Sequence, residues 1–168
     1  MIDLFPVLHA SVGPVALLAA AANLIRMWRW PSLATRCVPM LWILHLGHAW
    51  IVVALALKGL AGLVPAVMPS AAVHALTVGA IGSLTLGMMS RVALGHTGRV
   101  IVASTPIIAA FIVINVSAII RVVIPIAVPG FYLPGLIVAG LLWSSAFALF
   151  IIHYTPILMQ PRIDGKPG

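Results

Sequence analysis

Five long apolar runs limit what this chain can fold into. Each is long enough to cross a bilayer as a helix, which takes about 20 residues. Inside the hydrocarbon the backbone must satisfy its own hydrogen bonds, so such runs are expected to form spanning helices. The expected spans cover residues 4–25, 37–57, 71–89, 100–120 and 133–156. The sequence therefore predicts an all-α, polytopic transmembrane helical bundle, with residues 1–168 forming a single domain.

Composition places the chain in a membrane and excludes several other classes of protein. Hydrophobic residues make up 63% of the sequence and charged residues only 7%, far from the usual balance of a soluble protein. The net charge of +7 comes from scattered basic residues that are not interleaved with aromatic ones, so we expect no nucleic-acid partner. Cys37 is the only cysteine, which excludes a disulfide or a thiolate metal cage within one chain. The N-terminal segment carries Asp3 instead of positive charge and is expected to begin the first span, not a signal peptide.

The distribution of Lys and Arg predicts an orientation, because basic residues concentrate in cytoplasmic loops. With five spans, seven basic residues fall on one side: Arg26, Arg29, Arg36, Arg91, Arg99, Arg162 and Lys166. Lys58 and Arg121 fall on the other side. We therefore expect the N-terminus outside and the C-terminus inside.

Small residues recur at every fourth position of the third expected span. They are Ala75, Gly79, Ser83 and Gly87. A continuous stripe of small side chains lets a neighbouring helix approach closely. We therefore expect a structural stripe that makes this span the centre of the bundle.

The segment SRVALGHTGR, residues 90–99, is expected to form the cytoplasmic turn between the third and fourth spans. It has two interpretations. In one, the glycines give the backbone its freedom, Thr97 bonds locally and the arginines anchor the inner face. In the other, Arg91, His96 and Arg99 donate hydrogen bonds to an anion, a lipid head group or a cofactor carboxylate.

Histidines in the spans are the candidate metal ligands. His45 and His48 in LWILHLGHAW are three residues apart and therefore share a helix face. His9 and His74 lie in neighbouring spans, both expected one to two turns below the outer face. Neutral imidazole binds iron, copper and zinc. Because metal or haem ligation and hydrogen bonding between helices both explain intramembrane histidines, both explanations stay open, whereas His153 is expected to be mainly structural.

Acidic residues are missing from every expected span. Asp3 and Asp164 are the only two and lie at the chain ends. Their positions argue against a proton relay of carboxylates, an aspartyl intramembrane protease and a Ca²⁺ or Mg²⁺ site. Soft or borderline metals bound by histidine remain as candidates. Met88 or Met89 could add a thioether ligand, or they could be simple packing residues.

LWILHLGHAW followed by VHALTVGAIGSLTLGMMSRVALGHTGR resembles the signature region of the NnrS family. Members of this family are haem- and copper-containing bacterial inner-membrane proteins associated with denitrification and the nitric oxide response. The resemblance extends from about residue 23 to residue 154 and is to the C-terminal part of the longer family members. His48 stands where the family pattern has an aromatic residue. The positions that match the family pattern are His45, His74, Arg91, His96, Thr97, Gly98, Arg99 and Arg121.

The resemblance implies haem and copper as cofactors and a role in handling nitric oxide or nitrosative stress, with turnover left open. We expect the metal ligands to come from His9, His45, His48 and His74, and the cofactor or anion contacts from Arg91, His96, Arg99 and Arg121. The expected surroundings are the lipid bilayer of the bacterial inner membrane. An alternative function is a half-size transporter-like subunit that works as a homo-oligomer or with a partner chain supplying the N-terminal half. A third interpretation is a fragment or decayed gene product whose histidines are relics.

Overall fold

The computed structural model describes residues 9–31 and 34–165, except for the side chains of residues 9 and 10, and these ranges contain only helices and connections. The elements in chain order are α1 (His9–Trp28), α2 (Pro39–Leu60), α3 (Pro69–His74), the π-helical η3 (Ala75–Ile81), α4 (Gly82–His96), α5 (Thr105–Ala127), the 3₁₀-helical η4 (Pro129–Phe131) and α6 (Tyr132–Leu158). Five helices, with α3, η3 and α4 counted as one, are long and apolar enough to cross a membrane. The predictions of an all-α fold and of five spans are confirmed.

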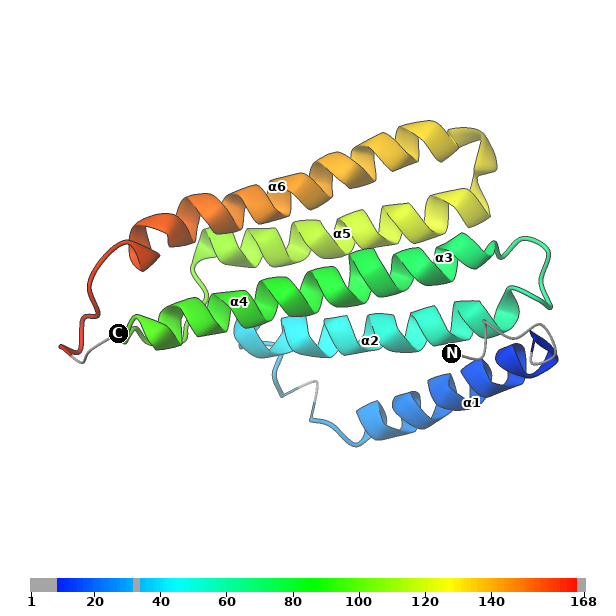
Figure 1. Ribbon diagram of the computed structural model, residues 1–168, viewed down its shortest axis with the longest axis horizontal. Coiled ribbons are helices and arrows are strands. Elements are labelled where there is room, and N and C mark those ends of the chain that lie inside the picture. The colour runs from blue at the N-terminus through cyan, green and yellow to red at the C-terminus, as the bar shows by residue number, and fades with distance from the viewer. Residues whose placement is uncertain (1–8, 32–33, 166–168) are drawn as a thin grey trace.

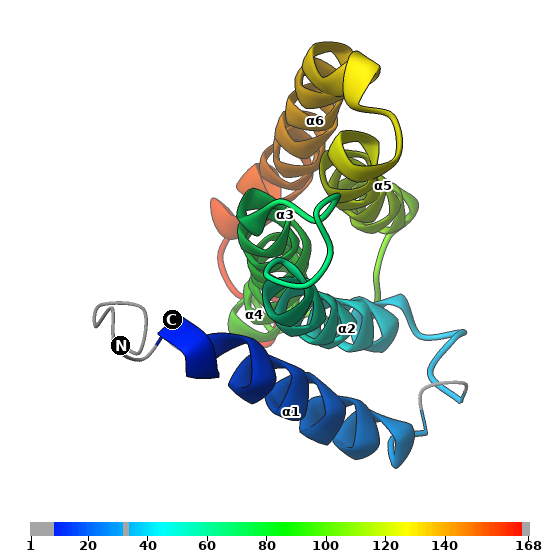
Figure 2. The same ribbon diagram turned by 90° about the vertical axis from the view of Figure 1, so that its right-hand side faces the viewer.

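The spans lie side by side in the order α1, α2, α3–η3–α4, α5 and α6 (Figures 1 and 2). The third span packs against α2 on one side and α5 on the other, and α4 also contacts α6. Its central position confirms the expectation drawn from the small residues. We call the end with the α1–α2 connection, the α4–α5 connection and the C-terminal tail the basic end, and the other the opposite end.

The third span is longer than predicted, because residues 90–96 of SRVALGHTGR continue α4. The expectation that the whole segment forms a turn is therefore wrong. The helix ends where Gly98 adopts a φ of +71°, with Arg99 N bonded to Leu94 O at 2.9 Å and Gly98 N to Gly95 O at 3.2 Å. This is the Schellman arrangement, which suits glycine because it has no Cβ. The Thr97 hydroxyl adds a 2.7 Å hydrogen bond to Ala93 O, so the predicted local bonding of Thr97 is confirmed.

The fourth span is shifted toward the C-terminus by five to seven residues, since α5 begins at Thr105 and ends at Ala127. Pro106 fixes its first turn, and the helix continues past Arg121 and contains Pro125. Arg121 therefore lies within the span and not in the connection where it was expected. The second and fifth spans match their predicted bounds within three residues. Of the first expected span, residues 4–8 lie outside the described residues, and α1 extends to Trp28.

The predicted stripe is buried along its whole length: Ala75, Gly79, Ser83 and Gly87. A Cβ added at Gly79 would lie 2.4 Å from Trp50 Cδ2, and one at Gly87 would lie 2.8 Å from Ile43 Cγ2. The backbone of the third span therefore touches side chains of α2 directly. The structural prediction for the stripe is confirmed.

The π-helical segment keeps this stripe on one face. Residues four apart in an α-helix overshoot a full turn by about 40°, because each residue turns the chain by about 100°. The wider π turn takes up part of this excess. The hydroxyl of Thr77, in this segment, donates a 2.8 Å hydrogen bond to Val73 O in α3.

Asn115 links three spans through its side chain. Its Oδ1 accepts a 2.9 Å hydrogen bond from Trp50 Nε1 and a 3.5 Å hydrogen bond from the Ser83 hydroxyl. Its Nδ2 donates to Phe111 O on its own helix at 2.8 Å. Both groups of the amide are thus satisfied where no water is at hand.

We predict that Gly79→Leu destabilises the bundle by about 1–3 kcal/mol, the usual cost of overpacking a close contact, because its side chain would collide with Trp50. The matched control is Gly95→Leu, since a Cβ at Gly95 has no atom within 4 Å. Thermal unfolding in detergent and the monodisperse fraction after purification measure the difference. Equal stability of the two variants would contradict the assigned contact.

Candidate functional site

A shallow, open cavity of about 620 Å³ lies at the basic end between the α1–α2 connection, α2 and α4. Its size falls within the range of about 300–1,000 Å³ that is typical of small-molecule and cofactor sites. The residues that line it are Trp30, Pro31, Leu44, His45, His48, Leu84 and Met88. The two histidines predicted to share a face of α2 are therefore in one cavity.

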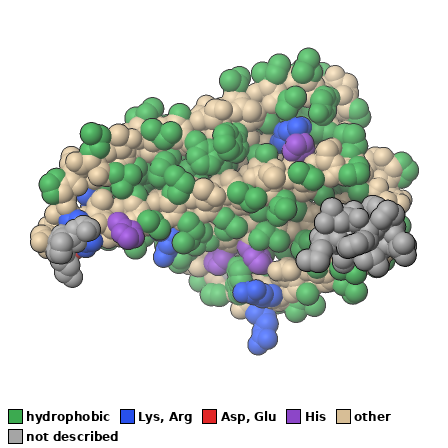
Figure 3. Space-filling view, in the orientation of Figure 1, with side chains coloured by type: hydrophobic (Ala, Val, Ile, Leu, Met, Phe, Trp, Pro, Cys, Tyr) green, Lys and Arg blue, Asp and Glu red, His purple; other side chains and the backbone are tan. Residues whose placement is uncertain are grey.

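His48 has a polar atom that no other residue satisfies. Its Nε2 is buried and has no hydrogen-bond partner. Its ring packs against Trp30 with 4.8 Å between centroids, and Arg26 lies near this side chain. Figure 3 shows histidine side chains on this face near Lys and Arg side chains. An unpaired buried nitrogen costs free energy unless something binds to it.

His45 is oriented from outside its own helix. Its Nδ1 lies 2.9 Å from the Thr35 hydroxyl in the α1–α2 connection. Its ring also packs against Trp30, at 5.3 Å between centroids. This contact orients the imidazole ring and leaves its other nitrogen for a ligand.

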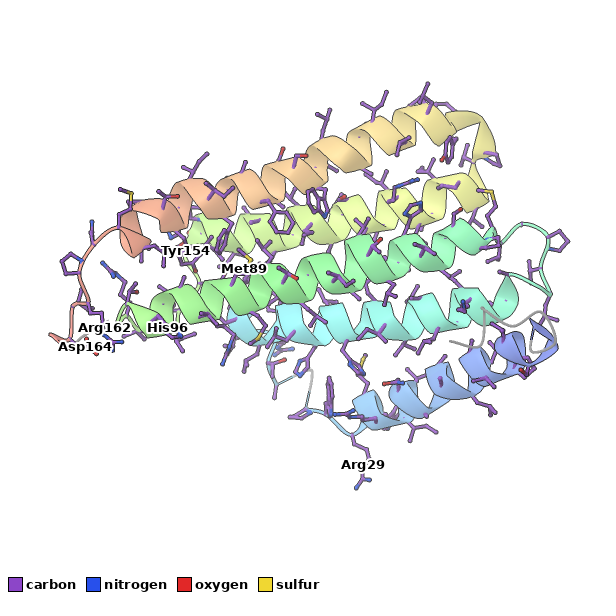
Figure 4. The ribbon with its side chains drawn as sticks, in the orientation of Figure 1. Arg29, Met89, His96, Tyr154, Arg162 and Asp164 are labelled. Atoms are coloured by element: carbon purple, nitrogen blue, oxygen red, sulfur yellow. The ribbon has the colours of Figure 1, made fainter. Side chains whose placement is uncertain are left out.

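The α4 wall of the cavity is apolar and ends in a positive charge. Leu84, Met88 and Arg91 recur at helical spacing and share one face of α4. Arg91 Nη1 donates a 3.4 Å hydrogen bond to Met40 O near the start of α2. Met89 lies on another side of α4, toward Tyr154 (Figure 4), and does not line this cavity. Of the two methionines considered from sequence, only Met88 therefore adjoins the histidines.

His74 lies elsewhere, in α3 near the opposite end, where it is half-buried and Arg121 lies near it. The side chain of His9 lies outside the described residues. Among the described side chains, no three from His, Cys, Asp and Glu lie close enough together to hold a metal ion. The structure thus brings together His45 and His48 but not His74. His153 has the expected structural contact, since its Nε2 lies 2.9 Å from the Ser104 hydroxyl.

The α4–α5 turn holds the C-terminal tail. Arg99 Nη2 donates a 2.8 Å hydrogen bond to Gln160 Oε1, and Ile163 N bonds to Thr97 O at 3.3 Å. A Cβ at Gly98 would lie 2.8 Å from the Asp164 carboxyl carbon. Asp164 also pairs with Arg162 at 2.6 Å.

The predicted donors of SRVALGHTGR are not gathered at one point. Arg91 faces α2, whereas Arg99 binds the tail and has a buried Nη1 without a hydrogen-bond partner. His96 is exposed and lies at the same end as Arg162 and Asp164 (Figure 4). These contacts favour anchoring at this end, while Arg91 alone reaches the helix face that lines the cavity.

Trp30 and Thr35 are members of the site that the sequence did not predict. Both precede α2 and approach its histidines only because the α1–α2 connection folds back over the helix. Connections have no periodicity that could place their side chains, so the sequence carries no signal for this contact.

We predict that Trp30→Ala accelerates modification of His48 by diethyl pyrocarbonate, because the indole covers the imidazole. Trp28→Ala is the matched control, since Trp28 is 87% exposed and covers neither histidine. In the wild-type protein the exposed His96 should react faster than His48. Peptide mass mapping over time gives the rates, and equal His48 rates in both tryptophan variants would contradict the covering role.

Comparison with known proteins extends the resemblance seen in the sequence. The family model described as NnrS protein matches residues 1–162 of the 168-residue chain. The match therefore continues beyond residues 23–154 in both directions. No match was found among curated proteins or solved structures. Because the match covers nearly the whole sequence, the chain belongs to the NnrS family.

Proposed function

We propose that this chain is a haem- and copper-binding protein of the bacterial inner membrane that acts in the nitric oxide response and in denitrification. Family membership suggests the nitric oxide response. The observation that carries the metal assignment is the buried, unpaired Nε2 of His48 in a cavity that His45 also lines. Two imidazoles in one membrane cavity with no acid beside them are a donor set for a borderline metal.

The donor chemistry of the cavity fits these groups. Imidazole binds both haem iron and copper, and the thioether of Met88 on the facing wall is a soft ligand that also suits copper or haem. Carboxylates, which would favour Mg²⁺ or Ca²⁺, are absent from all five described spans. A bound haem or copper would supply a metal that can bind nitric oxide. His45 and His48 are the residues that would hold it.

Surrounding residues orient the histidines. Thr35 fixes the ring of His45, and Trp30 packs against both imidazoles. Leu44 and Leu84 give the cavity apolar walls. Neutral imidazole is the form that binds metals.

Basic residues near the cavity suit an anionic group of a cofactor. Arg91 lies one turn beyond Met88 on the same face of α4. Arg26 lies with its guanidinium carbon 5.8 Å from the centroid of the Trp30 ring. We propose Arg91 as the contact for a cofactor carboxylate, because guanidinium pairs well with carboxylates.

We also propose that the basic end faces the cytoplasm, with the N-terminus outside and the C-terminus inside. The described residues Arg26, Arg29, Arg36, Arg91, Arg99 and Arg162 all lie at or near this end. Such an excess of positive charge is typical of cytoplasmic connections.

We predict that His48→Ala and His45→Ala each weaken metal binding by about tenfold or more, since even removal of an outer residue around a metal ligand costs about 10–100-fold. Thr35→Val should weaken metal binding less than either histidine variant, because Thr35 only orients His45. The Soret absorbance and the iron and copper content per folded protein are the measurements. His153→Gln is the control, because His153 bonds to Ser104 and does not line the cavity.

Unchanged metal content in both His45→Ala and His48→Ala would overturn the cavity assignment. Loss of metal only in His74→Ala would place the ligands at the opposite end. Purified wild-type protein that takes up neither haem nor copper would contradict the cofactor proposal itself.

The orientation has its own test. We predict that a reporter fused after Gly168 is active only in its cytoplasmic form, whereas one inserted in the α2–α3 connection at Gly62 is active only in its periplasmic form. The reason is the concentration of arginine at the basic end. Periplasmic activity of the fusion after Gly168 would contradict the proposed layout.

The alternative of a transporter-like subunit, working as a homo-oligomer or with a partner chain, stays a prediction. It differs from the proposed function in needing more than one chain. Native mass measurement of the same preparation gives the number of chains and of bound metals together.

A further inference from the structure

The middle span exposes one row of side chains along its length. This span, made of α3, η3 and α4, lies between α2 and α5 (Figure 1). Exposed residues recur along it every three or four positions, so they share one face of the helix. We call this row the outer ridge, and its residues are Thr77, Ile81, Thr85, Met88 and Val92.

The histidine cavity opens beside the outer ridge. Met88 belongs to both, because it lines the cavity and is also 48% exposed. Inside the cavity, the buried Nε2 of His48 has no hydrogen-bond partner. Among the described side chains, no third His, Cys, Asp or Glu joins His45 and His48. The chain by itself therefore leaves this polar site open on the side of the ridge.

Thr85 is a polar residue of the ridge near the middle of the membrane. It lies 11 residues before the end of α4 at His96, which is about 17 Å along the axis. Thr77 donates to Val73 O, whereas the hydroxyl of Thr85 makes no hydrogen bond with the described chain. A hydroxyl without a partner is costly in hydrocarbon. Because a hydroxyl both donates and accepts, Thr85 can pair with the same residue of a second copy.

The charge along the ridge also suits a second copy. Residues 77–88 contain no charged side chain, so two ridges can meet without like charges at the centre of the contact. Arg91 donates toward α2, to Met40 O, and Arg121 lies toward Tyr132 at the opposite end. Copies of one chain insert in the same orientation, so a two-fold axis along the membrane normal brings each residue to the depth of its own counterpart.

We propose that two copies of this chain pack through their outer ridges, about a two-fold axis normal to the bilayer, and that each copy covers the open side of the other's histidine cavity. Threonine is a common residue where membrane helices pack, because it is small and forms hydrogen bonds. The contact needs no metal, since the ridges make it. Its consequence for a cofactor rests on the proposed function: the imidazoles of both copies then lie at one depth.

Cysteine cross-linking in native membranes tests this contact. The exposed Cys37 is first replaced by serine. Ile81→Cys and Thr85→Cys should then give disulfide-linked dimers on mild oxidation, because a disulfide needs Cα atoms within about 7 Å. Ser145→Cys is the matched control. Ser145 is exposed on α6 and lies 13 residues before the end at Leu158, about 20 Å along the axis and so at a similar depth.

Native mass spectrometry of the full-length protein in a neutral detergent gives a second measurement. Thr85→Trp should lower the association constant of the dimer about tenfold, which equals about 1.4 kcal/mol, because the indole overpacks the contact. Ser145→Trp should leave the constant unchanged. The same spectra give the number of bound metals, which separates the proposed function from the transporter-like alternative whatever the number of chains.

Disulfide dimers in Ile81→Cys or Thr85→Cys, without dimers in Ser145→Cys, support the proposal. Equal cross-linking of Thr85→Cys and Ser145→Cys overturns it, because random collisions in the bilayer then explain both. Absence of disulfide dimers from both ridge cysteines also overturns it, whatever the mass in detergent. A dimer that takes up neither haem nor copper contradicts the proposed function alone, whereas a metal-loaded chain without ridge cross-links contradicts only the dimer.

Discussion

The close contact between α2 and the third span determines the rest of the architecture. Trp50 lies directly on the backbone at Gly79, and Ile43 lies on Gly87 in the same way. At Gly47, between the two histidines of the cavity, an added Cβ would lie 2.6 Å from Leu84 Cγ. Hydrocarbon gives little hydrophobic drive for helices to associate, so close packing must supply the attraction. The cavity has its shape because α4 can approach α2 this closely.

Sequence alone predicted the features that depend on periodicity. The length of the apolar runs predicted the five spans, and the four-residue spacing of small residues predicted the buried stripe. The three-residue spacing of His45 and His48 predicted that they share one face of α2. The helix ends were predicted less well, because charge was used to mark them. In the structure α4 ends at His96 and α5 runs from Thr105 to Ala127, so Arg91 and Arg121 both lie within helices. Trp30 and Thr35 could not be placed, since a folded connection brings them to the site.

The arginines of the bundle show how a chain almost without acids accommodates positive charge. Arg91 uses a backbone carbonyl, Arg99 a side-chain amide and Arg121 an aromatic ring. Each of these partners is neutral, so the charge is solvated but not cancelled. The uncancelled charge of Arg91 is what suits it to the proposed contact with an anionic group of a cofactor.

Asn115 has a consequence for how the helices assemble in the membrane. Its single oxygen serves donors from two other spans, Trp50 and Ser83, at one depth. If α5 slid by one turn against its neighbours, the indole N–H would be left unsatisfied in hydrocarbon at a cost of about 1–3 kcal/mol. The Asn115 amide therefore favours the one vertical alignment of α5 in which both donors are satisfied.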